Sequence, residues 1–396
     1  MSEKQHFGYS ESILKEMKGI FTAVEIDQQP QTWIETVSQI KKMKFELQEK
    51  MKIFLNQKDT QVIFMGAGTS EFVGRALASE INSKVLCNVQ ACGTTDMIVA
   101  PENYVDPTKE TLIVSFGRSG NSPESIGAVE AADAISSSTT HLLITCNPNG
   151  AMAKRATVKE NCCSICLSEK THDQSFAMTS SFSNMYLAAL MCFNLDVIDV
   201  IEKEIKTIAD YTENLLKNDY TKIEKMVNAF AFNRIVYLGA EGLKGISQES
   251  ALKMLELTAG KVVTMFDTPM GFRHGPKSIV DDQTLTVVYL SENSYRRQYE
   301  LDLIKEMSHQ RKANKILVVG NKKCIDIEGL VDDVIQFELP LTQSLLVGLP
   351  AICVAQLIAL FKSISLGITP DNPCPTGEVN RVVQGVVLYP FEKEGE

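Results

Sequence analysis

The residues best suited to chemistry lie in the segment ESALKMLEL and in the turn FRHGP that follows it. Glu249, Lys253 and Glu256 are spaced i, i+4 and i+7, so a helix would carry them on one face. Such a spacing usually marks a solvated face with Glu–Lys pairs. The turn shifts this balance, because His274 stands between two cationic residues that favour a neutral, proton-accepting imidazole. A carboxylate and a neutral imidazole together can move protons.

A second set of residues, in SFGRSGNSPES, has the composition of an anion-binding turn. Gly117 ends an apolar run, and Ser122 precedes Pro123 as an N-cap precedes a first helical residue. Glycines let backbone N–H groups converge on an anion, while Ser119 and Arg118 add a hydroxyl and a bidentate cation. The same residues could form a capped turn without a ligand, but their density favours phosphate. Since the chain lacks a G-x-x-x-x-G-K-[ST] loop, we expect a phosphate ester and not a nucleoside triphosphate.

Other motifs do not predict a cofactor or a metal. MGAGTSEF contains a lone G-x-G, and Gly74 is out of register for the third glycine of a dinucleotide-binding pattern. The cysteines of NCCSICLS alternate as in a buried strand, where Cys acts as a small hydrophobic residue. Zinc sites usually have two separated pairs of ligands, and the five histidines are scattered along the chain.

The elements that must position these residues repeat along the chain. The strand-like runs QVIFMGAG, TLIVSFG and HLLITCN return in the same order as RIVYLGAEG, TLTVVYLSEN and KILVVGN, each followed by a helical pattern. The strand-end residues Gly66, Ser115 and Asn147 recur 173, 176 and 174 residues later. This pattern predicts a duplicated α/β unit, and each half would be an open parallel sheet with its ligand site at the C-terminal strand ends.

Composition excludes several classes of protein. The 396 residues carry 39 basic and 49 acidic side chains, and a charge of −10 argues against a nucleic-acid partner. No uninterrupted apolar run reaches the roughly 18 residues of a membrane span, so we expect no membrane partner. The N-terminus has no signal-peptide core, and the ten cysteines therefore indicate reduced thiols in the cytoplasm.

SFGRSGNSPES, ESALKMLEL and FRHGP resemble the two SIS (sugar isomerase) domains in the isomerase half of glucosamine-6-phosphate synthase, over about residues 50–389. The synthase's glutaminase half is missing, and Ser2 stands where that half has its cysteine. The stretches TAVEIDQQPQTWIE and PDNPCPTGEVNRVVQG resemble a narrower family, AgaS, of tagatose-6-phosphate ketose/aldose isomerases and galactosamine-6-phosphate deaminases. The resemblance implies an α/β fold of two tandem SIS domains, each a doubly wound, flavodoxin-like parallel sheet. The implied ranges are an N-terminal helical segment 1–49, SIS domains 50–205 and 206–370, and a tail 371–396 closing the site.

The resemblance also implies roles for single residues. Glu256 is similar to the carboxylate that moves a proton between C1 and C2 of the sugar. His274 is similar to the ring-opening histidine that reaches into the neighbouring subunit's site. Lys253 and Glu249 resemble its active-site lysine and a nearby glutamate. The substrate's phosphate would bind at Gly117, Arg118, Ser119, Ser122 and Ser70.

Two positions depart from the synthase. The synthase has a lysine in its tail loop, whereas residues 378–389 here contain only Arg381 as a cation, a possible replacement. Gly117 stands where the synthase has a hydroxyl.

These inferences together predict a cofactor-free enzyme that converts galactosamine 6-phosphate to tagatose 6-phosphate and ammonia. An aldose–ketose isomerase of a hexose 6-phosphate would carry the same motifs. A third alternative, a non-catalytic sugar-phosphate sensor, usually has an N-terminal helix-turn-helix, and residues 1–57 show no clear basic recognition helix. A histidine acting in the neighbouring subunit implies a homodimer or higher homo-oligomer with the site at a subunit interface.

Overall fold

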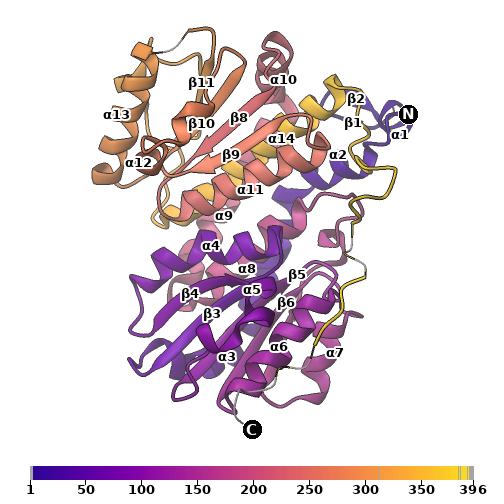
Figure 1. The fold of residues 1–396 in the computed structure, drawn as a ribbon, viewed down its shortest axis with the longest axis vertical. Helices are drawn as coiled ribbons and strands as arrows, with labels where there is room; N and C mark the ends of the chain where they lie inside the picture. The colour runs from indigo at the N-terminus through magenta and orange to yellow at the C-terminus, as the bar shows by residue number, and fades with distance from the viewer. Residues whose placement is uncertain (1–2, 311, 382, 384, 390, 392–396) are drawn as a thin grey trace. The chain divides into compact units, whose positions relative to one another are not determined.

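The computed structural model describes residues 3–310, 312–381, 383, 385–389 and 391. They fold into two compact units, each built on a five-stranded parallel sheet (Figure 1). The β3–β7 unit comprises Glu35–His172, Ser180–Ile198 and the chain from Glu378 on. The β8–β12 unit comprises the chain up to Ile34, Asp173–Thr179 and Asp199–Gly377. The predicted α/β class with two doubly wound parallel sheets is confirmed.

The sheet of the β3–β7 unit has the order β4-β3-β5-β6-β7. Its parallel strands are β3 (Thr60–Gly66), β4 (Asn88–Gly93), β5 (Glu110–Gly117), β6 (Thr139–Thr145) and β7 (Cys162–Cys166). Its helices are most of α3 (Gln29–Leu55), α4 (Thr69–Asn82), α5 (Thr94–Val99), α6 (Pro123–Ile135), α7 (Ala151–Val158) and α8 (Ser180–Cys192), with short helices η1 (Pro101–Asn103), η2 (Glu169–Thr171) and η3 (Leu195–Val197). The predicted strand of cysteines is β7, and its thiols are mostly buried.

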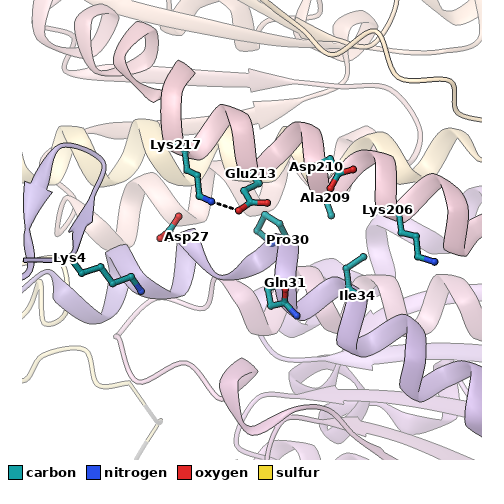
Figure 2. A pocket seen from close by; sticks show the side chains of 10 residues that line it. All are labelled: Lys4, Asp27, Pro30, Gln31, Ile34, Lys206, Ala209, Asp210, Glu213 and Lys217. Atoms are coloured by element: carbon teal, nitrogen blue, oxygen red, sulfur yellow. Dashed lines mark hydrogen bonds and ion pairs between the residues drawn. The ribbon is translucent and has the colours of Figure 1, made fainter. Parts of the chain in front are cut away.

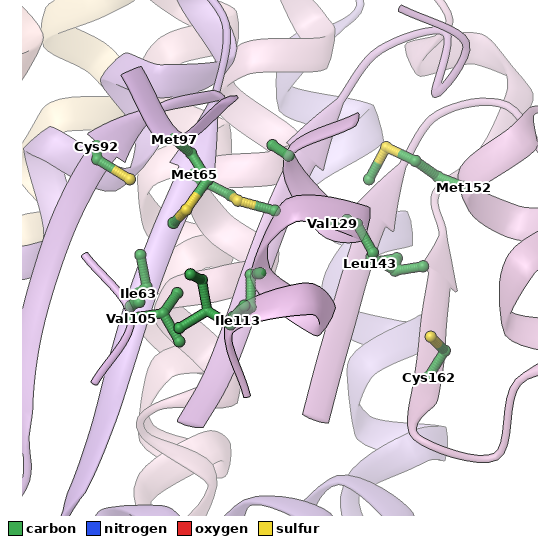
Figure 3. Close-up of a cluster of buried hydrophobic side chains, with 13 residues drawn as sticks. Ile63, Met65, Cys92, Met97, Val105, Ile113, Val129, Leu143, Met152 and Cys162 are labelled. Carbon is green, nitrogen blue, oxygen red and sulfur yellow. The ribbon is translucent and has the colours of Figure 1, made fainter. Parts of the chain in front are cut away.

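The core of this unit explains why the strands read as continuous apolar runs. Ile63, Met65, Ile113 and Leu143 of three neighbouring strands are fully buried and pack with helical residues such as Val129 (Figure 3). Strands covered on both faces have no solvent side, so polar alternation disappears. β3 and β5 pair in parallel, so their carboxyl ends lie side by side at one edge of this buried sheet.

The sheet of the β8–β12 unit has the order β9-β8-β10-β11-β12. Its parallel strands are β8 (Arg234–Leu238), β9 (Val263–Asp267), β10 (Thr284–Leu290), β11 (Lys315–Gly320) and β12 (Asp333–Gln336). Its helices from α9 on are α9 (Ile198–Asn214), the π-helical η4 (Leu215–Asp219), α10 (Tyr220–Ala229), α11 (Gly242–Leu257), α12 (Pro269–Phe272), η5 (Pro276–Ile279), α13 (Ser294–Gln310), η6 (Ile325–Ile327), η7 (Ser344–Val347) and α14 (Gly348–Ser365). This order repeats that of the other sheet, and β8, β10 and β11 occupy the places of β3, β5 and β6.

The sequence had suggested a helical N-terminal segment, but the structure shows that this segment is not helical throughout. β1 (Gln5–His6) and β2 (Tyr9–Ser10) form an antiparallel hairpin before α1 (Glu11–Glu16) and α2 (Ile20–Asp27). The turn needs positive φ at Phe7 and Gly8, and a side chain at Gly8 would meet the Tyr220 hydroxyl at 2.9 Å. Trp33, within the segment that was expected to be helical, lies in α3.

Helix α14 is the most apolar long helix of the described chain. The segment Ser344–Ser365 has the length and hydropathy of a membrane span, but 94% of its apolar window is buried inside the protein. It packs against α10 and α11. This burial identifies α14 as a core helix that packs against α11.

Candidate active site

Helix α11 carries a buried charge cluster and not the solvated face that is common for its spacing. Glu249 and Lys253 have no exposed side-chain surface, and Lys253 Nζ lies 3.3 Å from Glu249 Oε1. Lys253 Nζ also donates to Glu256 Oε2 at 2.5 Å. Glu256 keeps 22% of its side chain exposed, so its carboxylate is the accessible end of the cluster.

The electrostatics of this cluster keep the lysine charged. Burial disfavours the Lys253 ammonium, but attraction by Glu249 and then Glu256 outweighs it, so the pKa of Lys253 lies above its ordinary value. A buried ammonium between two carboxylates supplies fixed positive charge without solvent reorganisation. Such a group can stabilise negative charge that develops next to Glu256.

The turn with His274 follows β9 and is ordered by its own backbone. Thr268 caps α12, since its hydroxyl accepts from Gly271 N at 3.0 Å. The His274 amide donates to the Gly271 carbonyl at 2.9 Å, and Gly275 turns the chain with φ +114°. The His274 residue is exposed. The predicted turn is confirmed, and it presents an imidazole to solvent.

The turn after β5 has its carbonyl groups fixed toward the β6–α7 turn. The carbonyl of Arg118 accepts from Cys146 N, the carbonyl of Gly120 accepts from Met152 N at 3.0 Å, and Asn147 Nδ2 donates to the Ser119 carbonyl at 2.9 Å. In a trans peptide the next N–H points opposite to the carbonyl, so the following amides face away from these partners. Amides at the start of a helix can bind an anion, so this orientation is compatible with the predicted phosphate-binding turn.

The side chains of this turn add hydroxyls to the same face. Ser119 Oγ accepts from Asn121 N at 3.3 Å, which places it on the amide side. Ser122 is the N-cap residue and Pro123 begins α6, as predicted. The Ser122 hydroxyl, however, shares a hydrogen bond with Ser125 Oγ at 2.6 Å and does not cap a backbone amide.

The tail residue Arg381 belongs to the same unit as this turn. Arg118 is buried, and its Nη2 donates to the Arg381 carbonyl at 3.0 Å. The tail backbone thus fixes Arg118, whereas the role of the Arg381 side chain stays a prediction. Ser70 lies in the first turn of α4, at the carboxyl end of β3, the neighbour of β5.

The structure therefore groups the predicted residues within two units. Ser70, residues 117–122 and Arg381 belong to the β3–β7 unit. Residues 249–256 and His274 belong to the β8–β12 unit. Their catalytic and binding roles remain predictions.

Sequence reasoning missed two supports of these groups. Asn147 and Met152 hold the turn after β5, and Glu306 on α13 pairs with both cations that flank His274, Arg273 and Lys277. Residues so distant along the chain leave no local pattern, so only the fold could identify them.

Other features of the described residues do not belong to these groups. No cluster of three or more His, Cys, Asp or Glu side chains there is arranged to hold a metal ion. The β8–β12 unit has a hollow of about 450 Å³ beside α2, α3 and α9, where lysines and carboxylates such as Lys217 and Glu213 face one another (Figure 2). None of the predicted site residues lines it.

Comparison with known proteins shows which family the chain belongs to. A family model for the SIS domain matches residues 54–195. The D-galactosamine-6-phosphate deaminase AgaS of Escherichia coli is 39% identical over 377 residues, which are 94% of this chain and 97% of that protein. The protein of the same name from Shewanella sp. (strain ANA-3) is 40% identical over 383 residues, 96% of this chain and 94% of that one.

A solved structure is similar over the whole chain. It comes from Clostridium novyi NT, is provisionally named a tagatose-6-phosphate ketose/aldose isomerase, and is 42% identical. It superposes with a TM-score of 0.95 and covers 98% of this chain and 100% of that one. Given identities near 40% over nearly complete chains, the protein belongs to the AgaS family of SIS-domain proteins.

Proposed function

We propose that this protein is an enzyme that converts galactosamine 6-phosphate and water to tagatose 6-phosphate and ammonia. The proposal rests on the buried Glu249–Lys253–Glu256 cluster. The relatives of the chain in E. coli and Shewanella are named deaminases of this substrate. A solvated Glu–Lys face would not need burial, and burying charges is costly unless they are paired. A charged cluster with one accessible carboxylate fits proton transfer.

We assign the substrate's phosphate to the turn after β5. The amides that follow Arg118 and Ser119, together with the hydroxyls of Ser119 and Ser122, match the acceptor oxygens of a phosphate monoester. Arg118, fixed by the tail, adds positive charge. We also place Ser70 and Gly117 in this binding group. The remote phosphate would fix the geometry of the reacting carbons.

We assign the chemical steps to the β8–β12 unit. His274 moves a proton between O5 and O1 and so opens the sugar ring. Glu256 then removes the C2 proton, and O1 takes up a proton to give an enolamine. Glu256 redelivers its proton to C1 while the nitrogen loses one, so that the aldehyde with a C2 amine becomes a C1 hydroxymethyl group with a C2 imine. Water adds to the imine carbon, and ammonia leaves. Lys253, held by Glu249, stabilises the negative charge that develops on the oxygen at C1.

An aldose–ketose isomerase is the second candidate, because the similar Clostridium structure bears that provisional name. Its chemistry uses the same ring opening and proton transfer without loss of an amine. A sugar-phosphate sensor is disfavoured, because these relatives are named as enzymes. We further propose that the enzyme works in the cytoplasm as a homodimer or larger homo-oligomer, with His274 acting in the neighbouring subunit's site.

Ammonia release tests this function. Purified protein would be incubated with galactosamine 6-phosphate, with glucosamine 6-phosphate in parallel, and both ammonia and tagatose 6-phosphate would be measured. Equal amounts of ammonia and tagatose 6-phosphate from the galacto substrate are the expected result. No ammonia from either amino sugar, with tagatose 6-phosphate formed from galactose 6-phosphate, would establish the plain isomerase instead.

A further inference from the structure

One carboxylate holds both ends of the turn that carries His274. Glu306 Oε2 lies 3.0 Å from Arg273 Nε, and Glu306 Oε1 pairs with Lys277 Nζ. Lys277 Nζ donates as well to Gln310 Oε1 at 2.9 Å, one turn further along α13. The residues on both sides of His274 are therefore tied to one helix.

That helix is itself fixed in the core. Leu303, Ile304 and Met307 of α13 are buried in the same apolar cluster as Phe272, the residue before Arg273. Glu306 lies between Ile304 and Met307 in sequence, so its backbone cannot shift without disturbing this packing. The contacts of Glu306 with Arg273 and Lys277 therefore hold the turn in a fixed position relative to the core.

Glu306 is also suited to this task by its charge. A hydrogen bond from Lys277, followed by the charges of Lys277 and Arg273, holds the pKa of Glu306 below its ordinary value. The carboxylate is therefore ionised at neutral pH and binds two cations at once. Without it, Arg273 and Lys277 would repel each other across a turn that already contains a glycine at φ +114°.

We infer that Glu306 is a positioning residue, whose carboxylate fixes the turn that presents His274 for ring opening. This inference rests on the proposed function for the role of His274, but the anchoring itself does not. Displacement of a reacting group by about 1 Å can cost on the order of 10²-fold in rate. The effect should fall on turnover, because the turn after β5 and not His274 is assigned the phosphate.

The test compares the full-length wild-type protein with Glu306→Gln, Glu306→Asp and the control Asp302→Asn. Asp302 is an exposed carboxylate one turn earlier on α13. Two quantities are measured for each: kcat and KM for ammonia release from galactosamine 6-phosphate, and the rate of tryptic cleavage after Arg273 and Lys277 by mass spectrometry.

For Glu306→Gln we expect kcat to fall about 10²-fold with KM changed by no more than about twofold. Cleavage in the turn should become about tenfold faster, because proteolysis follows local opening. Glu306→Asp should recover part of both losses, and Asp302→Asn should match the wild type.

Two outcomes would overturn the inference. An unchanged cleavage rate in Glu306→Gln would show that the carboxylate does not hold the turn, whether or not the wild type releases ammonia. Faster cleavage with a wild-type kcat would show that the anchored position is irrelevant to turnover. A wild type that releases no ammonia would instead refute the proposed function, while the cleavage comparison would still decide the anchoring.

Discussion

The turns after β5 and β10 occupy the same place in two sheets with equivalent strand order. Their backbone groups, however, have different hydrogen-bond partners. After β5, the carbonyls are bound by the neighbouring turn and the amides face away from it. After β10, the amide and hydroxyl of Ser291 both donate to the buried carboxylate of Glu300, at 2.8 Å for the amide. We assign an external anion to the first turn, whereas the second already holds a side-chain carboxyl group of the same unit.

The turns after β3 and β8 show a related difference. Gly68 and Glu241 have nearly the same backbone angles, φ 54° and ψ −125° against φ 53° and ψ −127°. This conformation is natural for glycine and strained for other residues. The two units thus share the backbone of this turn, and the residues to which we assign the chemical steps lie on α11 and in the His274 turn. Shared strand order therefore locates candidate turns, and only side chains decide which turn binds and which helix reacts.

The largest effect should come from Glu256→Gln on α11. A general base contributes about 10²–10⁴-fold to a rate, and glutamine cannot accept the C2 proton, so kcat for ammonia release should fall by about that factor. The fold should persist, because the side chain is partly exposed and glutamine has the same shape. Glu241→Gln removes a carboxylate at the opposite end of the same helix and should keep wild-type turnover. Wild-type turnover by Glu256→Gln would remove α11 from the chemistry.

The next effect tests whether the α11 cluster is held by charge pairing. Lys253→Met leaves Glu249 buried without its cation, which should lower the free energy of unfolding by about 3–5 kcal/mol. Adding Glu249→Gln should restore most of the stability but not the activity. Urea unfolding checks both variants, with exposed Lys244→Met on the same helix as the control. An unchanged free energy of unfolding in Lys253→Met would show that the buried Glu249 does not need the charge of Lys253.

The β5 turn can be tested with inorganic phosphate as the probe. A side chain at Gly120 would need φ +61° and would lie 2.9 Å from Thr145 Oγ1, so Gly120→Ala should distort the turn. We expect about 1–2 kcal/mol of destabilisation and at least about tenfold weaker phosphate binding by calorimetry. Gly329→Ala has a similar φ, +76°, in open space, and it should share the strain without the loss of phosphate binding. Equal phosphate affinity in both variants would exclude this turn as the binding site.

Much of the fold could be predicted from sequence because its signals are local. Apolar runs that end in Gly, Ser or Asn identified β3, β5, β6, β8, β10 and β11, and the Ser122–Pro123 pair identified the start of α6. The N-terminal hairpin was missed, because its two-residue strands depend on positive φ at Phe7 and Gly8, which periodicity does not report.

The candidate site was less accessible to sequence reasoning. Spacing alone cannot distinguish a solvated Glu–Lys face from the buried cluster around Lys253, since burial depends on what packs above the helix. The Ser122–Ser125 pair and the anchoring of the His274 turn by Glu306 likewise depend on contacts that only the folded chain creates.

The smallest effect tests the buried carboxyl group of Glu300 in the β10 turn and has a defined dependence on pH. Burial is the main reason that the pKa of Glu300 lies above its ordinary value, despite the opposing hydrogen bonds from Ser291. A raised pKa in the folded state means that the folded protein binds the proton more tightly than the unfolded chain. The stability from this group is therefore complete below the unfolded pKa of about 4.5 and declines as pH rises through the folded pKa.

Glu300→Gln cannot titrate, so the variant should lose the most stability relative to wild type near pH 4 and progressively less toward neutral pH. Urea unfolding at several pH values measures this difference, with about 0.5–1.5 kcal/mol expected at the acid end from the disturbed Ser291 contacts. Phosphate should stabilise neither protein through this turn, because the glutamine still fills the place of the carboxylate. A difference that stays constant from pH 4 to 7 would mean that the Glu300 carboxyl titrates alike in the folded and unfolded states, and its burial would then not raise its pKa.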